Sequence, residues 1–138
     1  MECDCTRISL SIRHPSRPAA DLCRALPFAP SRTWDVGAPC TNPKGVPQPG
    51  YFAETYATFP LSESAGPPAE AVSAAAERVA PYGDRLRAWQ AEGGACAFFV
   101  GWFMEGGQSG DLFEPELLGR LGALGIGLSL DIYSGADL

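Results

Sequence analysis

The sequence predicts an α+β fold, a two-layer sandwich with helices on one face of a mixed, mostly antiparallel sheet of about five strands. Apolar and polar residues alternate over 6–14 and again over 126–133, which is typical of strands with one buried face. Segments with helical spacing of apolar residues lie between the strand-like segments. Helices that connect strands of one sheet make right-handed crossovers, so we expect them on one face.

The first strand is predicted over 6–14. Its aliphatic side chains stand at positions 8, 10 and 12, and Arg7 and Arg13 lie on the opposite side. A short helix follows, with Ser16 as its cap. Pro27 ends this helix because proline cannot continue one.

Three segments are predicted in the next part of the chain. A brief strand is expected over 31–36. The stretch 40–50 holds three prolines and two glycines, which predicts a loop. Aromatic residues and threonines favour a strand over 51–59, which exposes either its even-numbered or its odd-numbered side chains.

A long helix is predicted from Pro67 to Gly93, because apolar residues recur every three or four positions. Pro81 interrupts this pattern and should kink or break the helix. Gly93 is suited to the end of the helix.

The last part of the chain completes the sheet. The strand 95–104 is apolar on both faces, which places it in the middle of the sheet. A last helix begins at Pro115 and ends at Gly125. The strand 126–133 follows, and its aliphatic side chains at 126, 128, 130 and 132 are expected to face the core.

Length and composition indicate one domain. The chain has 138 residues, and we expect a single domain over 1–138 with a frayed end over 1–5. No apolar run approaches the roughly 20 residues that cross a bilayer, and the polar, acidic start is unlike a signal peptide. Five cysteines, an odd number without regular spacing, indicate reduced thiols. We therefore expect a cytoplasmic protein that does not bind a membrane.

The net charge of −6 is unevenly distributed along the chain. Residues 1–44 carry six basic and four acidic side chains, and residues 45–138 carry four basic and twelve acidic ones. An acidic chain repels the phosphate backbone, so nucleic acid is not an expected partner. The acidic part is better suited to a basic protein partner.

No catalytic residue, metal site or cofactor is predicted. His14 is the only histidine, and its place beside Pro15 favours a turn residue over a catalytic base. Cys3 and Cys5 form a Cys-x-Cys pair but lack two further zinc ligands. The glycines after Glu105 lack the Gly-Lys-Ser/Thr ending of a phosphate-binding loop. These observations favour a protein that is not an enzyme, without excluding one.

The polar sides of the two end strands predict a surface that binds a ligand or a partner. If the helices cover the apolar face, the other face displays charged and aromatic side chains. The residues proposed to bind are Arg7, Arg13, Trp34, Asp131 and Tyr133. Arg, Tyr and Trp are the residues that binding surfaces favour. The alternative is a solvated face on which Arg7 and Asp131 pair across strands.

Two motifs carry a family resemblance. The first is Pro30-Ser31-Arg32-Thr33-Trp34-x-x-Gly37, and the second is the closing Leu-Ser-Leu-Asp-Ile-Tyr-Ser of residues 128–134. Together with the order of strands and helices, they resemble the bacterial domain-of-unknown-function family number forty-two seventy-nine, over residues 6–134. The resemblance implies no established activity, and the Pro-rich segment 40–50 departs from the family pattern.

The leading functional hypothesis is a non-enzymatic protein-binding module. By analogy, small acidic single-domain bacterial proteins of this kind include immunity proteins, which neutralise a toxin. The rival hypothesis is a small-ligand-binding protein or an enzyme with an anion-binding pocket between the sheet face and the segment 40–50. We expect a monomer, or a homodimer that forms through an exposed sheet edge.

Overall fold

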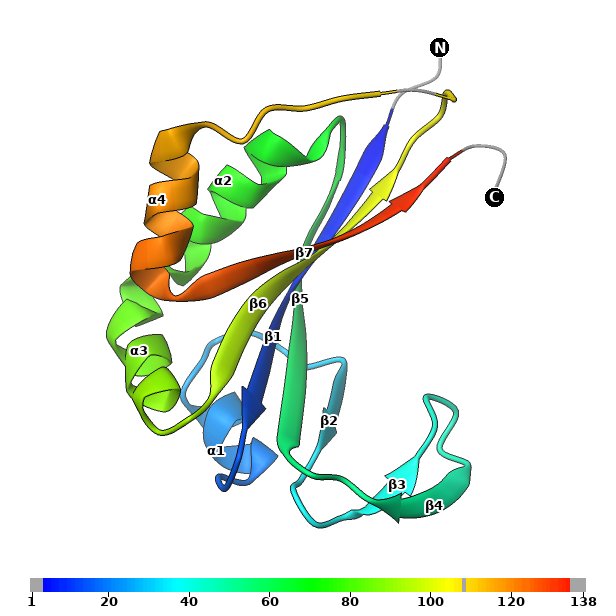
Figure 1. Ribbon diagram of the computed structural model, residues 1–138, viewed down its shortest axis with the longest axis vertical. Helices are drawn as coiled ribbons and strands as arrows, with labels where there is room; N and C mark the ends of the chain where they lie inside the picture. The colour runs from blue at the N-terminus through cyan, green and yellow to red at the C-terminus, as the bar shows by residue number, and fades with distance from the viewer. Residues whose placement is uncertain (1–3, 108, 135–138) are drawn as a thin grey trace.

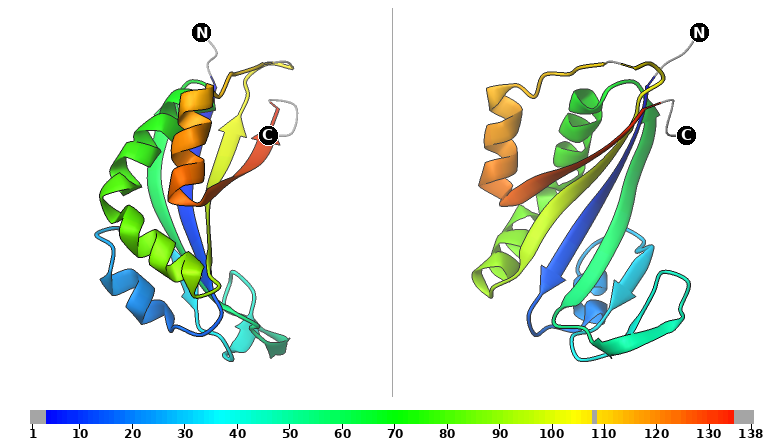
Figure 2. Two further views of the ribbon diagram at one scale, coloured as in Figure 1. Left: turned by 60° about the vertical axis from the view of Figure 1, so that its left-hand side comes forward. Right: turned by 45° about the vertical axis from the view of Figure 1, so that its right-hand side comes forward.

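The computed structural model describes residues 4–107 and 109–134 and confirms the predicted α+β fold (Figure 1). Helices pack against one face of a mixed, mostly antiparallel five-stranded sheet, and Figure 2 shows the two layers from other sides. No helix in the described ranges is long and apolar enough to span a bilayer.

The sheet has the strand order β2–β5–β1–β6–β7. Its strands are β1 (Cys5–His14), β2 (Arg32–Trp34), β5 (Thr55–Ala65), β6 (Ala95–Phe103) and β7 (Ile126–Tyr133). Neighbouring strands are antiparallel except β6 and β7, which are parallel because a helix returns the chain between them. β1 therefore lies in the middle, between two long antiparallel neighbours, and the strand predicted over 95–104 is the interior strand β6, next to the edge strand β7.

The helices within the described residues are α1 (Ala19–Arg24), α2 (Pro68–Val79), α3 (Gly83–Ala91) and α4 (Pro115–Leu124). The long helix predicted to end at Gly93 is broken at Pro81, as expected. A short 3-10 turn, η1 (Ala80–Tyr82), joins α2 to α3 at this point. α4 ends at Gly125, whose φ of 69° is left-handed, and a Cβ there would clash with the side-chain amide of Gln90.

The core lies between the sheet and the helices. Alternate residues of the strands point into it, as their period of two predicts. The large side chains that are almost fully buried come from both layers and include Ile8, Leu10, Ile12, Phe59 and Phe98 from the strands and Leu22, Val72, Val79 and Leu86 from the helices. The prediction that the aliphatic side of 6–14 faces the helices is confirmed.

β7 is buried only at its start. Ile126 is buried and Leu128 is half-buried, but Leu130 and Ile132 are 42% and 51% exposed. α4 directly precedes β7, and β7 runs away from it in Figure 1, so the second half of the strand lies beyond the helices. The prediction that all four aliphatic side chains face the core is therefore wrong for the last two.

Two short strands, β3 (Pro39–Thr41) and β4 (Pro47–Tyr51), replace the loop predicted over 40–50. They form a separate antiparallel hairpin that extends from the sheet on the side away from the helices (Figure 2). The prolines are tolerated because both strands of a two-stranded hairpin are edge strands, whose outer N–H groups need no partner. At the tip, the side chain of Asn42 accepts hydrogen bonds from the N–H groups of Lys44 and Val46.

β1 begins inside the segment 1–5, for which the sequence predicts a frayed end. The carboxylate of Asp4 accepts hydrogen bonds from the indole N–H of Trp102 and the hydroxyl of Ser109, each at 2.8 Å. These two bonds lower the pKa of Asp4. Because its partners are about 100 positions away in the chain, local sequence gives no sign of this contact. Residues 1–3 lie outside the described residues.

Candidate recognition face

The sheet face opposite the helices, which we call the open face, carries all the residues predicted to bind. These are Arg7, Arg13, Trp34, Asp131 and Tyr133. They do not form one group. Arg13 and Trp34 lie on either side of Tyr56 in one row of the sheet. Arg7 lies six residues away along β1, which is roughly 20 Å, in the same row as Asp131.

One end of the open face carries the Trp34 cluster, which consists of Arg13, Arg32, Trp34, Phe52, Glu54 and Tyr56. The Trp34 ring stacks on Phe52 with 4.2 Å between ring centroids, and on Tyr56 with 4.5 Å. The guanidinium groups of Arg13 and Arg32 lie 4.7 Å from the centroids of the Tyr56 and Trp34 rings, respectively. β1, β5 and β2 therefore place a row of stacked planar groups across the sheet.

Hydrogen bonds fix the Trp34 cluster and connect it to the hairpin. The indole N–H of Trp34 donates to the carbonyl oxygen of Glu54 at 3.0 Å, and the Glu54 carboxylate lies 3.3 Å from Arg13. The N–H of Gly37 donates to the carbonyl oxygen of Phe52 at 2.8 Å. The cluster therefore also holds the base of the β3–β4 hairpin.

The other end carries the Tyr133 cluster, which consists of Arg7, Glu63, Phe103 and Tyr133. The Phe103 and Tyr133 rings are stacked with 4.9 Å between centroids. The Arg7 guanidinium lies 5.1 Å from the centroid of Phe103, and its Nε lies 3.3 Å from Oε1 of Glu63. A cation, two rings and a carboxylate thus lie together at this end of the open face.

Arg7 and Asp131 do not form the pair considered as the alternative. β6 lies between β1 and β7, and Gly101 separates the two residues in their row. A Cβ at Gly101 would lie 3.3 Å from the Phe103 ring, so the ring covers the space that the glycine leaves. Arg7 pairs with Glu63 of β5 instead, and no ion pair joins Asp131 to another described residue.

Small side chains cover the open face between the two clusters. They are Ser9, Ser11, Ala97, Gly101 and Ser129. Phe99, which is 38% exposed, lies among them. The open face therefore carries two clusters of large Arg and aromatic side chains, and mostly small residues of mixed polarity separate them.

Sequence reasoning missed Arg32, Glu63 and Phe103. The strand 95–104 is apolar on both faces, so its pattern does not show which aromatic rings leave the core. Glu63 lies beyond the predicted end of the strand 51–59, although Leu61 continues its alternation past Pro60 and signals the extension.

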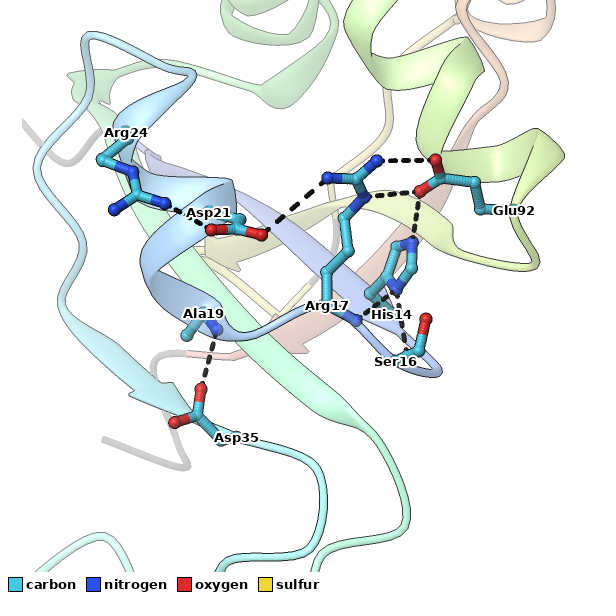
Figure 3. Close-up of polar contacts among 8 residues, drawn as sticks. All are labelled: His14, Ser16, Arg17, Ala19, Asp21, Arg24, Asp35 and Glu92. Atoms are coloured by element: carbon cyan, nitrogen blue, oxygen red, sulfur yellow. Dashed lines mark hydrogen bonds and ion pairs between the residues drawn. The ribbon is translucent and has the colours of Figure 1, made fainter.

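His14 is a buried turn residue at the end of β1, as its neighbour Pro15 indicates (Figure 3). Its Nδ1 accepts hydrogen bonds from the N–H groups of Ser16 and Arg17, so Nε2 carries the proton that is donated to Glu92 at 2.8 Å. Both ring nitrogens are therefore occupied, and neither is available to a substrate.

Glu92 connects this turn to the end of α3. Arg17 donates two hydrogen bonds to its carboxylate, at 2.6 and 2.8 Å. These bonds and the one from His14 lower the pKa of Glu92 to about 2. The side chain of Arg17 also approaches Asp21 of α1 (Figure 3). The network joins the end of β1, α1 and the end of α3, and it engages both ring nitrogens of His14 and both carboxylate oxygens of Glu92.

The N-cap position of α1 is Pro18 and not Ser16, as the sequence predicts. The first N–H of the helix is satisfied by Asp35, whose Oδ1 accepts a hydrogen bond from Ala19 at 2.7 Å (Figure 3). Ser16 is held by His14 instead, because its N–H donates to the imidazole. A contact over 16 positions thus replaces the local one.

A cavity of about 540 Å³ lies between α1, β2 and the base of the hairpin, where the rival hypothesis places an anion-binding pocket. Trp34 and Phe52 line it, together with small apolar side chains of α1. The charged group in its lining is the carboxylate of Asp35, and no basic side chain lines it. The cavity is therefore electrostatically unsuited to an anion.

The chain matches no protein-family model, no curated protein and no solved structure. The resemblance to family number forty-two seventy-nine therefore stays a prediction. Within residues 4–107 and 109–134, no three His, Cys, Asp or Glu side chains are grouped as metal ligands would be. The fold and the site define an α+β protein whose five-stranded main sheet has helices on one face and two Arg–aromatic clusters on the other.

Proposed function

We propose that this protein is a small, non-enzymatic protein-binding module of the bacterial cytoplasm, which contacts its partner with the open face. The observation that carries the proposal is the pair of Arg–aromatic clusters at the two ends of an uncovered sheet face. Arg, Tyr and Trp dominate the binding energy of protein interfaces because they combine planar apolar area with hydrogen-bonding groups. The free thiols of Cys5, Cys23, Cys40 and Cys96 support a reducing compartment.

The clusters are arranged before any partner binds. Side chains that are already stacked and ion-paired lose less conformational entropy on binding. The Arg7–Glu63 pair is 62% and 61% exposed, and exposed pairs of this kind contribute little to folding stability. Breaking this pair would therefore change the free energy of unfolding little. Both side chains are exposed on the open face, so they are accessible to a partner.

The specific form that we favour is an immunity-like module for a basic toxin. Up to Arg87 the chain has nine basic and nine acidic residues, and after it one basic and seven acidic ones. The excess negative charge therefore lies in the C-terminal part of the chain, which forms β6, α4 and β7. Acidic surfaces raise the association rate with basic proteins.

The test compares two charge-removing variants. The protein is used to isolate its partner from source cells, and the affinity of the purified pair is then measured by calorimetry. We expect Arg7→Ala together with Arg13→Ala to weaken binding at least roughly tenfold. Arg24→Ala together with Arg85→Ala is the matched control, because it also removes two charges and because these arginines are exposed on α1 and α3. Equal affinities of the two variants would refute the open face as the binding site.

The rival function, an anion-binding protein or enzyme, has a separate test. At low millimolar concentration and constant ionic strength, phosphate, sulfate and citrate should leave the melting temperature unchanged, because Asp35 supplies the charge of the cavity beside the hairpin. A rise in melting temperature that saturates in this range with one of the anions, unlike the general stabilisation by concentrated salts, would favour the rival.

A further inference from the structure

The two edges of the sheet are built differently. β2 is three residues long, contains Arg32, and leads within a few residues into the β3–β4 hairpin. β7 is eight residues long, contains no proline, lysine or arginine, and pairs with β6 from Cys96 to Phe103 without a register shift. Short strands, prolines and charged side chains, lysine above all, are the features that keep natural edge strands from pairing. β7 has one charged side chain, Asp131, and none of the other features.

The outer edge of β7 is also apolar and uncovered. The strand order ends at β7, so within the described residues no strand lies beside its outward N–H and C=O groups. Leu130, Ile132 and Tyr133 are 42%, 51% and 40% exposed. A long, regular edge with exposed apolar side chains is the geometry that strand addition requires.

We propose that β7 accepts an extended basic segment of a partner protein as a sixth strand. The inference rests on the proposed function, that the protein binds a protein partner, and it names a second contact and its chemistry. Main-chain hydrogen bonds to the outer edge of β7 would supply affinity, and alternate side chains would supply specificity.

Charge decides between a foreign strand and a second copy of this chain. Asp131 lies on β7, and the exposed Glu105 follows Met104, whose N–H donates to the carbonyl oxygen of Tyr133 at 2.7 Å. A second β7 would bring another Asp131 and no basic residue. It would also place two copies of the acidic part of the chain side by side. A strand with Lys or Arg is attracted by the same charges.

The two sides of β7 specify the pattern of the added strand. Leu130 and Ile132 lie on the helix side, and Asp131 and Tyr133 on the open face. In an added strand, side chains of one parity would pack against the two aliphatic residues. Those of the other parity would meet the carboxylate and the Tyr133 ring, which favour a cation. The segment therefore alternates Val or Ile with Lys or Arg.

The probe is a synthetic peptide of about nine residues that alternates Val or Ile with Lys or Arg, labelled for fluorescence anisotropy. Because main-chain hydrogen bonds carry strand addition, the alternation suffices without the natural sequence. Binding should weaken at least roughly tenfold when Glu replaces the basic residues or when alternate peptide nitrogens are methylated. Hydrogen exchange should slow at β7.

Two variants of the protein locate the contact. Ile132→Lys should weaken peptide binding at least roughly tenfold, because it places a like charge at the edge. Leu118→Lys is the matched control, since Leu118 is 49% exposed on α4, and it should bind as the native protein does. Because both side chains are exposed, both variants should fold.

Three results would each overturn the inference: no binding of the basic peptide, binding that Ile132→Lys leaves unchanged, or self-association through β7 in sedimentation experiments. Raising the salt concentration should weaken the peptide complex but strengthen a self-associated form. If the basic peptide does not bind but the Arg7→Ala, Arg13→Ala variant still binds the partner more weakly, only the β7 inference is refuted. If the peptide binds but that variant binds the partner as tightly as the control does, only the proposed open-face contact is refuted.

Discussion

At the scale of single residues, Trp34 connects two parts of the molecule. Its ring stacks on Tyr56 of the neighbouring strand β5. It also stacks on Phe52, which lies just before β5 at the base of the hairpin. The same ring contacts Arg32, and its N–H bonds to the Glu54 carbonyl. One side chain thus serves both the stability of the hairpin base and the surface proposed for recognition.

Replacing Trp34 separates these contributions. Trp34→Ala should lower the free energy of unfolding by about 2–3 kcal/mol, because a large half-buried ring loses its contacts. Trp34→Phe keeps a stacked ring but loses the hydrogen bond to Glu54, so we expect a loss of about 1 kcal/mol. Urea unfolding followed by circular dichroism measures both values, and similar losses would contradict the importance of the ring.

The lowered pKa of Glu92 predicts how the stability of the fold depends on pH in acid. Its pKa falls from 4.5 to about 2 in the folded protein, because Arg17 and His14 hydrogen-bond its charged form. The stability that it supplies is therefore complete above about pH 4.5 and is lost as the pH falls toward 2. We expect Glu92→Gln to have a flatter dependence of melting temperature on pH between about 4.5 and 2 than the native protein. Parallel curves would show that the pair is not formed in solution.

At the scale of elements, alternation and proline positions predict most of the fold. The strand 6–14 and the break at Pro81 follow from local pattern, because period and steric exclusion act within a few residues. The hairpin over 40–50 is not predictable in this way, since prolines weaken strands except at edges. The exposure of Leu130 cannot be predicted from the sequence either, because it depends on where α4 stops covering the sheet.

The candidate site is predictable in part for the same reason. The parity of the two end strands places four of the five predicted residues, all but Trp34, on one face, but parity says nothing about separation along a strand. The two clusters therefore emerge only from the register of β1 with β5 and β6.

The end of α4 offers a matched pair of glycines. Gly125→Ala should destabilise the protein by about 1–2 kcal/mol or more, because its φ is 69° and a Cβ would meet Gln90. Gly119→Ala, inside the same helix with no atom within 4 Å of the added Cβ, should stabilise it by roughly 0.5–1 kcal/mol. Thermal melts of both variants check the signs, and two changes of equal sign would contradict the assigned helix end.

At the scale of the whole molecule, stability should decrease from the middle of the sheet outward. β1 is paired on both sides, and its alternate side chains are almost fully buried. The β3–β4 hairpin, by contrast, is largely exposed and forms its own two-stranded sheet. The distribution of contacts thus places the most cooperative part of the fold at the N-terminal strand.

Native-state hydrogen exchange measures this gradient directly. The amides of β1 should exchange slowest, through global unfolding, and those of β4 should exchange faster by several orders of magnitude, through local opening. Equal protection of the two strands would mean that the hairpin is part of the cooperative core.

The placement of the three tryptophans has a practical consequence for optical work on this protein. Trp89 and Trp102 are only 2% and 6% exposed, whereas Trp34 is half-buried on the open face beside two arginines. Quenchers dissolved in the buffer therefore reach the indole of Trp34 far more readily than the other two. Intrinsic emission thus gives a label-free signal that responds to occupancy of that end of the sheet.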